Sequence, residues 1–129
     1  ISKADSTSVD YGLKRESTGV KPFAFQAGGT TVTSSITTTT GTWYFVVCWL
    51  DSLGDTVNIQ VNDGAVDSVA EQIAATNTVD FLIGATKGLL GADSFHDGRI
   101  DSVTLWKRVL SADERTELYN NGDGLDYSS

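Results

Sequence analysis

The sequence has few residues of the types whose presence would indicate a particular chemistry, such as a disulfide, a metal site or a catalytic nucleophile. In 129 residues it has no Met, one Pro, one Cys and one His. A single Cys cannot form an internal disulfide, and one Cys with one His cannot supply the protein ligands of a zinc site. A hydrolytic nucleophile would depend on His96 as its base, and no nucleophile-elbow motif accompanies it. The sequence therefore gives no support to zinc chemistry or to serine-type hydrolysis.

Long apolar runs and positive charge are also scarce. The longest apolar run, Trp43 to Leu50, is far shorter than the ~20 residues that a membrane helix requires. The chain has 17 acidic and nine basic residues and a formal charge of −8, whereas a polyanion is bound by clustered Lys and Arg. We therefore expect neither membrane insertion nor a nucleic-acid partner. No signal peptide is visible, and the opening Ile1 without Met suggests that the true start lies elsewhere.

What the chain does have is a series of short strand patterns separated by turn signals. Apolar and polar residues alternate from Val57 to Val61, and Asn62-Asp63-Gly64 follows as a hairpin turn. Similar patterns lie at 9–13, 23–25, 43–50 and 79–83, while the Thr-rich stretch 30–42 suits a sheet edge or a loop. The length fits one domain. The sequence therefore predicts an all-β fold, an antiparallel two-sheet sandwich.

The last third of the chain combines a strand pattern with a capped helix. Apolar residues alternate from Ile100 to Trp106, after a glycine, Gly98, that suits a bulge or a close backbone approach. Ser111 and Glu114 have the spacing of a capping box, and Gly122 can end a helix in the left-handed conformation. We expect a last strand over 100–106 and a helix over about 112–120.

Several short motifs follow one another along the chain. In order they are Ile1-Ser2-Lys3, Gly41-Thr42-Trp43, Val57 to Gly64, Phe81 to Gly84, Ile100-Asp101, Leu110-Ser111, Asp113-Glu114 and Leu118 to Gly122. This series resembles the laminin-G-like, concanavalin A-like lectin/glucanase family across essentially the whole chain. The resemblance implies a jelly-roll sandwich with one short C-terminal helix.

The same resemblance implies that the domain, residues 1–129, is N-terminally incomplete. In the family several dozen residues usually precede the Ile-Ser-Lys segment and supply the first strands of the sandwich. The chain is then either a fragment of a longer protein or a minimal version covered by a partner or by a second copy. Both alternatives predict unusual strand edges or apolar surface.

Enzyme activity is not expected. Glucanases of this family place two or three carboxylates along one strand, because glycosidic cleavage needs an acid and a nucleophile or base at fixed separation. No such pattern occurs here: Asp97 and Asp101 flank Gly98 at a different spacing, and Asp101 stands at a position that suits a structural hydrogen bond.

Calcium is the cofactor that the resemblance raises, since several relatives bind it and loop aspartates suit it. The candidate ligands form two pairs, Asp51 with Asp55 and Asp93 with Asp97. Neither spacing is that of a recognised calcium loop. Solvated turn aspartates in an acidic protein are the alternative interpretation.

The strand over 43–50 is apolar on both faces. If its even-numbered residues face the sandwich interior, Phe45, Val47 and Trp49 face the other side. Such a stripe must be covered by another protein segment, or it offers a stacking platform for a sugar ring. Phe45, Val47 and Trp49 are therefore the candidate ligand-binding or interface residues.

Three other apolar residues have a packing interpretation. Trp43 matches the core tryptophan of the family, and Trp106 lies in the expected last strand, where the family often has an aromatic. Cys48 sits in an apolar strand and is expected to be a small buried hydrophobe.

The resemblance implies a noncatalytic recognition module, extracellular or exposed on a cell or virion surface, with glycan as its ligand class. The alternative is a structural or assembly module, such as a decoration or fibre domain, that binds protein chains, with a homo-oligomer or the remainder of a longer chain as partner. A glycan binder should gather aromatic and amide side chains on one exposed surface. An assembly module should bury Phe45, Val47 and Trp49 between chains.

Overall fold

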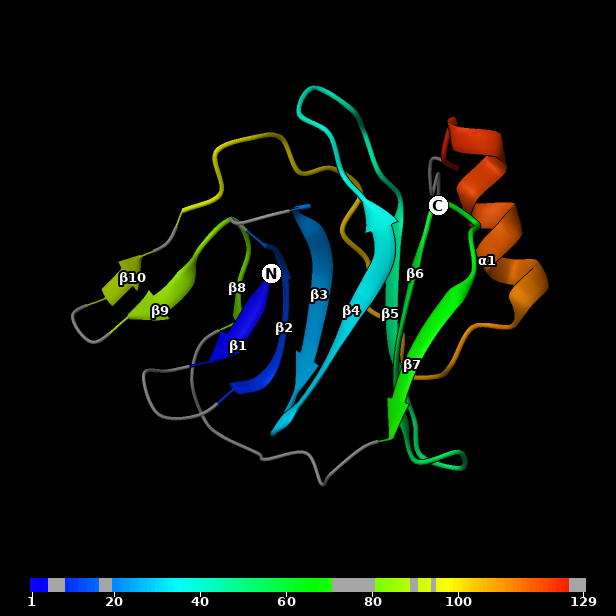
Figure 1. Cartoon of the computed structure of the whole chain (residues 1–129), viewed down its shortest axis with the longest axis horizontal. Helices are drawn as coiled ribbons and strands as arrows, with labels where there is room; N and C mark the ends of the chain where they lie inside the picture. The colour runs from blue at the N-terminus through cyan, green and yellow to red at the C-terminus, as the bar shows by residue number, and fades with distance from the viewer. Residues whose placement is uncertain (5–8, 17–19, 71–80, 89–90, 94, 126–129) are drawn as a thin grey trace.

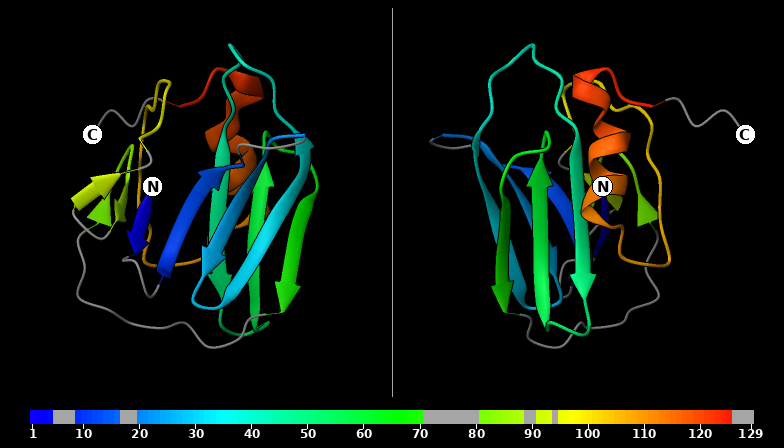
Figure 2. Two further views of the ribbon diagram at one scale, coloured as in Figure 1. Left: turned by 60° about the vertical axis from the view of Figure 1, so that its left-hand side comes forward. Right: turned by 90° about the vertical axis from the view of Figure 1, so that its right-hand side faces the viewer.

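Two antiparallel sheets face each other, and one short helix follows them near the C-terminal end (Figure 1). The computed structural model describes residues 1–4, 9–16, 20–70, 81–88, 91–93 and 95–125. Figure 2 shows the sheets as separate layers. The structure confirms the expected all-β sandwich with one short C-terminal helix.

The large sheet has five strands in the order β4-β3-β2-β1-β8. Its members are β1 (Ser2–Ala4), β2 (Val9–Arg15), β3 (Pro22–Ala27), β4 (Thr30–Thr37) and β8 (Phe81–Leu82). The small sheet has the order β5-β6-β7, with β5 (Val46–Asp51), β6 (Thr56–Val61) and β7 (Val66–Ala70). A separate hairpin pairs β9 (Thr86–Gly88) with β10 (Gly91–Asp93). The expected strand over 79–83 corresponds to β8, and residues 79–80 lie outside the described part of the chain.

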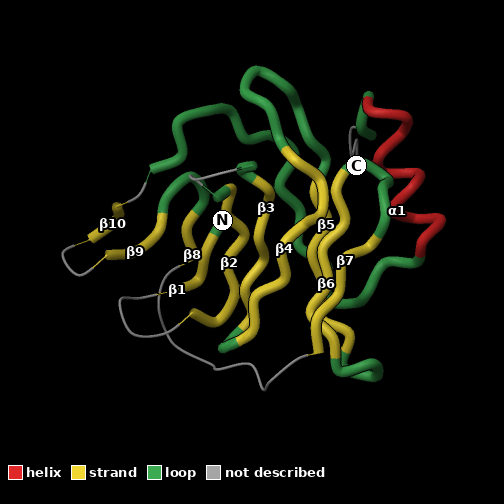
Figure 3. Tube along the Cα trace, viewed as in Figure 1, coloured by secondary structure: helices red, strands yellow, loops and turns green. Residues whose placement is uncertain are grey.

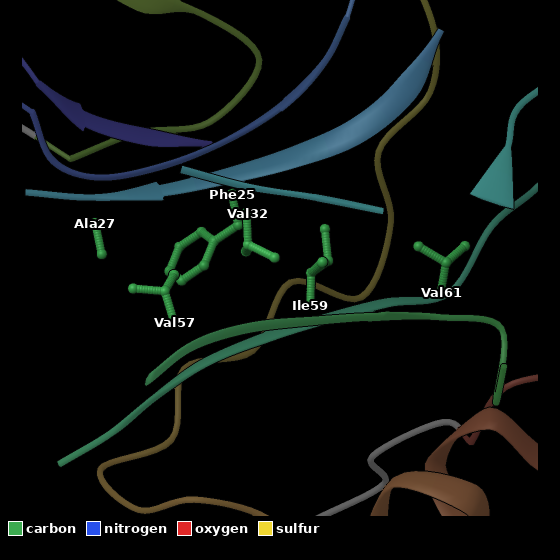
Figure 4. Packing of buried hydrophobic residues seen from close by; sticks show 6 residues of the cluster. All are labelled: Phe25, Ala27, Val32, Val57, Ile59 and Val61. Carbon is green, nitrogen blue, oxygen red and sulfur yellow. The ribbon is translucent and has the colours of Figure 1, made fainter. Parts of the chain in front are cut away.

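The core lies between the two sheets. Six buried side chains form it: Phe25, Ala27 and Val32 from the large sheet, and Val57, Ile59 and Val61 from the small one (Figure 4). The Thr-rich stretch forms β4 at an edge of the large sheet, and its alternate side chains are buried. Burial on one face explains why a polar, β-branched sequence forms a regular strand there.

The β6–β7 connection is the tight turn that the sequence predicts. Asn62 and Asp63 have φ values of 56° and 43°, in the left-handed region that Asn and Asp tolerate. The Asn62 N–H donates to the Phe45 carbonyl at 2.8 Å, and the Phe45 N–H donates to Asn62 Oδ1 at 2.9 Å. The β5–β6 ladder therefore continues one residue pair beyond Val46.

The helix α1 (Ala112–Tyr119) begins at the predicted capping box. The Glu114 N–H donates to Ser111 Oγ at 3.2 Å, and the Ser111 N–H donates to Glu114 Oε2 at 2.8 Å. The helix ends at Asn120, which has the left-handed φ of 47°, and a short 3₁₀ turn (Asn120–Gly122) follows. The expectation that Gly122 ends the helix is wrong, because an Asn two residues earlier already adopts that conformation.

Glu114 predicts a specific pH dependence for this helix. Hydrogen bonds from Arg108 and then from the Ser111 backbone lower the pKa of Glu114 from 4.5 to about 2. Because the folded pKa is depressed, the stabilisation is present above the unfolded value and is lost as pH falls from 4.5 toward 2. A carboxyl NMR titration should show the Glu114 carboxyl still ionised well below pH 4.5. In Arg108→Gln the pKa of Glu114 should move back toward 4.5, because the charged donor is lost. An unchanged Glu114 titration in this variant would contradict Arg108 as the cause of the lowered pKa.

The stretch 100–106, expected to be the last strand, is not one. It follows an irregular path between β10 and α1 (Figure 3), and Ile100 and Leu105 are 42% and 68% exposed. A strand requires the backbone of a neighbouring strand, and no described strand pairs with this stretch. All residues of 100–106 are exposed, so the alternation in the sequence does not correspond to one buried and one exposed face here.

Candidate functional site

A hollow of ≈1710 Å³ opens beside β5. It is lined by residues of β2, β3 and β5, the loop over 39–45, the segment 95–110, and Arg115 and Leu118 of α1. We call the half-buried apolar residues that line it and pack against the core the inner wall: Tyr11, Leu13, Phe23, Tyr44, Val46, Cys48 and Leu50. We call its exposed lining residues within 39–43 and 95–109 the rim.

The inner wall is an apolar surface continuous with the core. Its side chains pack against the buried cluster, and the rings of Phe23 and Tyr44 meet edge-on at 5.8 Å between centroids. Burial raises the pKa of the Cys48 thiol well above its usual range. A thiol that stays protonated is a poor nucleophile, so the buried-hydrophobe interpretation of Cys48 agrees with its surroundings.

Trp43 is the most conspicuous aromatic of the rim. It is 59% exposed, so the expectation that it packs in the core is wrong. The physical reason is that β5 begins only at Val46, which leaves Trp43 on the loop that projects beyond the sheets (Figure 1). The Thr39 N–H donates to the Tyr44 hydroxyl at 2.9 Å and ties this loop to the Tyr44 ring. The loop therefore holds an exposed tryptophan at the hollow.

The segment 95–101 contributes an aromatic and several polar groups to the rim. Phe95 is 73% exposed, and the His96 N–H donates to the Gly84 carbonyl at 2.7 Å. A Cβ on Gly98 would lie 2.7 Å from His96 Nε2, which is the close approach predicted for this glycine. Asp101 Oδ1 accepts from the Ser102 N–H at 2.7 Å, the structural role expected for it.

Trp106 also lines the hollow, farther along the same segment. It is 37% exposed, and the Arg108 guanidinium lies 5.7 Å from its ring centroid. Its expected packing role in a last strand is not realised, because that strand does not form.

The stripe of Phe45, Val47 and Trp49 lies on the outer face of β5, beneath α1. The rings of Phe45 and Tyr119 are 6.0 Å apart, and the Arg115 guanidinium lies 4.4 Å from the Trp49 ring centroid. All three stripe residues are half-buried. The helix of the same chain is thus a cover that the sequence pattern did not reveal. A ligand or a further partner at this stripe stays a prediction.

Among the four acidic candidates for calcium, the structure describes the surroundings of Asp51, Asp55 and Asp97. Asp51 Oδ1 accepts the N–H groups of Leu53 and Gly54 at 3.0 and 3.1 Å, so it closes its own turn. Asp55 has a φ of 46° in the same turn, and Asp97 lies on the rim. For Asp93 the structure describes only its place in β10. The described residues contain no group of three or more His, Cys, Asp or Glu that fits a metal ion. Calcium binding stays a prediction that this geometry does not favour.

Within the described residues, none of the helices has the length and apolar character needed to cross a membrane.

Comparison with known proteins gives a match to one protein family. No curated protein and no solved structure gives a significant match. A family model described as the concanavalin A-like lectin/glucanases superfamily matches residues 1–114, which is most of the chain. The chain therefore belongs to the concanavalin A-like lectin/glucanase superfamily.

Proposed function

We propose that this domain is a noncatalytic recognition module, extracellular or surface-exposed, that binds a glycan at the rim of the hollow. The observation that carries the proposal is the exposure of Trp43 on a loop held in place by the Tyr44 hydroxyl. A large aromatic fixed at the mouth of a hollow offers an apolar face to a ligand that also has polar edges.

The surroundings of Trp43 have the mixed character that a sugar requires. Phe95 adds a second exposed ring to the same lining, and His96 and Asp97 add hydrogen-bonding groups. Imidazole and carboxylate groups can accept from, and imidazole can donate to, the hydroxyls of a saccharide. Membership of a superfamily that includes lectins supports this ligand class, although the fold alone does not assign it.

The rim acids support recognition over hydrolysis. Glycosidic cleavage uses two carboxyl groups, and the surroundings of the acid must keep it protonated. Asp97 and Asp101 are both exposed, and Asp101 Oδ1 accepts the backbone N–H of Ser102. Neither residue has the apolar enclosure that a general acid needs.

Replacing Trp43 with Ala tests the proposal. We expect a glycan array to identify a ligand, and Trp43→Ala to weaken its binding about tenfold, because tenfold corresponds to ~1.4 kcal/mol, near the upper range for an aromatic contact. Leu53→Ala is the matched control, since Leu53 is 98% exposed in the β5–β6 turn outside the hollow.

Three results would contradict the proposal. The first is the absence of any glycan that binds above background, and the second is equal binding by Trp43→Ala. The third is release of reducing sugar from the bound glycan, which would make the module catalytic. The competing function, binding of protein chains, is favoured by a separate feature, the edge of β5 that no described strand pairs with.

A further inference from the structure

The chain contains three Asp-Gly pairs, and they differ in how the backbone around them is held. The pairs are Asp63-Gly64, Asp97-Gly98 and Asp123-Gly124. The carboxyl group of an aspartate can react with the backbone nitrogen of the next residue, and a glycine there has no Cβ to shield that nitrogen. The hydrogen bonds at each pair therefore decide how readily the two groups meet.

The Asp63-Gly64 pair has both of its reacting groups engaged elsewhere. Asp63 lies in the β6–β7 turn with a left-handed φ of 43°, and the Gly64 N–H donates to the Val61 carbonyl at 3.0 Å. Asp63 Oδ1 accepts the Thr116 hydroxyl at 2.9 Å. Reaction at this pair would first require the turn to open.

The Asp123-Gly124 pair is held by the turn that ends α1. The Gly124 N–H donates to the Tyr119 carbonyl at 3.2 Å, and the Asp123 N–H donates to the Asn120 carbonyl at 3.1 Å. The Asn120 side chain also donates to the Gly124 carbonyl at 2.9 Å. The Gly124 nitrogen cannot approach the Asp123 carboxyl group without breaking its own hydrogen bond.

The Asp97-Gly98 pair has no such restraint. Both residues are exposed and lie in an irregular segment of the rim. In the part of the chain that the structure describes, neither the Asp97 carboxyl group nor the Gly98 N–H forms a hydrogen bond. The segment is anchored one residue earlier, where the His96 N–H donates to the Gly84 carbonyl at 2.7 Å. Asp97 and Gly98 can therefore rotate without breaking a described hydrogen bond.

We infer that Asp97 is a site of spontaneous isomerisation to isoaspartate. The Gly98 nitrogen attacks Asp97 Cγ and gives up its proton to the solvent, while one carboxyl oxygen leaves as water. The two groups are neighbours in one chain, so this closure to a cyclic succinimide needs no second molecule. Water then adds to one of the two ring carbonyls. Opening at one of them restores aspartate, and opening at the other gives isoaspartate.

The product changes the shape of the rim and keeps its charge. Isoaspartate retains one carboxylate but places an additional methylene group in the main chain before Gly98. His96 and Arg99, which also line the hollow, would therefore shift relative to each other. The reaction needs no ligand in the hollow, so it is independent of the proposed glycan binding.

Ageing the purified protein at neutral pH compares the three pairs. An endoproteinase that cleaves before aspartate but not before isoaspartate, followed by mass spectrometry, measures the modified fraction at each position. In the folded protein, isoaspartate at 97 should accumulate at least about tenfold faster than at 63 or 123, because opening one backbone hydrogen bond costs on the order of a factor of ten in population. In urea the three pairs should react at similar rates, because the turns are lost.

Two matched variants, Asp97→Asn and Asp63→Asn, repeat the comparison with a different readout. Each creates an Asn-Gly pair that closes to the same kind of succinimide with loss of ammonia, and hydrolysis then leaves a heavier product. In the folded protein, Asp97→Asn should convert at least about tenfold faster than Asp63→Asn. Asp97→Glu, whose longer side chain cannot form this ring, should show no isomerisation at 97. Circular dichroism checks that each variant is folded.

Three results would overturn the inference. One is an equal rate at all three Asp-Gly pairs of the folded protein, or equal conversion of the two Asn variants. Another is an absence of isoaspartate at 97 in the folded protein while the protein in urea forms it, which would mean that the folded segment restrains Asp97. The third is a difference between the pairs that persists unchanged in urea, which would assign it to the neighbouring sequence and not to the fold.

Discussion

Replacing Arg115 with Ala is expected to lower the free energy of unfolding by about 2–4 kcal/mol, because this one side chain contacts two residues of the small sheet, Gln60 and Trp49, and the loop before α1. Arg115 Nε donates to Gln60 Oε1 at 2.7 Å, and Nη1 donates to the Leu110 carbonyl at 2.7 Å. The guanidinium also stacks on Trp49. Its loss leaves the buried Gln60 oxygen without this donor and uncovers the indole ring.

The helix depends on these contacts because it has no buried residue of its own. Two other helix residues also contact this side of the sandwich. The Thr116 hydroxyl donates to Asp63 Oδ1 at 2.9 Å, and the Tyr119 ring packs against the Phe45 ring. Arg115→Lys is the matched control. Lysine keeps the charge but lacks the planar fork, so we expect an intermediate loss in urea denaturation. A loss below about 0.5 kcal/mol for Arg115→Ala would show that α1 does not need this anchor.

Replacing Ile59 with Ala is expected to cost about 2–5 kcal/mol, the range for removing a large buried aliphatic side chain. Ile59 is fully buried at the centre of the core, where both sheets supply its neighbours (Figure 4). The cavity that remains cannot collapse easily between two hydrogen-bonded sheets.

Val69→Ala provides the comparison on the neighbouring strand. Val69 is 42% exposed, so its truncation should change the urea midpoint only slightly. If both variants lost the same stability, the core would not lie where the structure places it. If only Val69→Ala were destabilised, β7 and not β6 would carry the buried core of the small sheet.

Features that depend on a few neighbouring residues could be predicted from the sequence. The turn at Asn62-Asp63 and the capping box of Ser111 and Glu114 are local arrangements that residue type and spacing specify. The alternation in β6 identified Val57, Ile59 and Val61 as core residues, but it did not predict that Asn58 and Gln60 on the other face are also buried. Such features require no knowledge of distant parts of the chain.

Features that depend on distant partners could not be predicted in this way. The stretch 100–106 has a strand pattern, yet strand formation requires a backbone beside it. The cover of Trp49 depends on where α1 docks, which its weakly apolar sequence does not indicate. Trp43 was assigned to the core by family position, and its exposure follows from the place where β5 begins.

The candidate site in the structure therefore lies on the loop before β5, whereas the sequence predicted it on one face of the strand. The sequence indicated an apolar strand with more apolar surface than one core needs, and in the structure every residue of β5 is half-buried. It did not indicate the hollow, which is formed by segments as distant in sequence as Leu13 and Trp106. A usable signal was present in Gly41-Thr42, since a glycine turn just before a tryptophan can present that residue on a loop.

The most direct measurement of the proposed function is an NMR titration that follows the indole N–H signals of the three tryptophans while a glycan from the array is added. Trp43 is exposed at the rim, whereas Trp49 lies beneath Arg115 of α1. We predict that the Trp43 signal shifts progressively to saturation and that the Trp49 signal stays in place. A shift of Trp49 without Trp43 would contradict a rim site and would place the ligand at the outer face of β5.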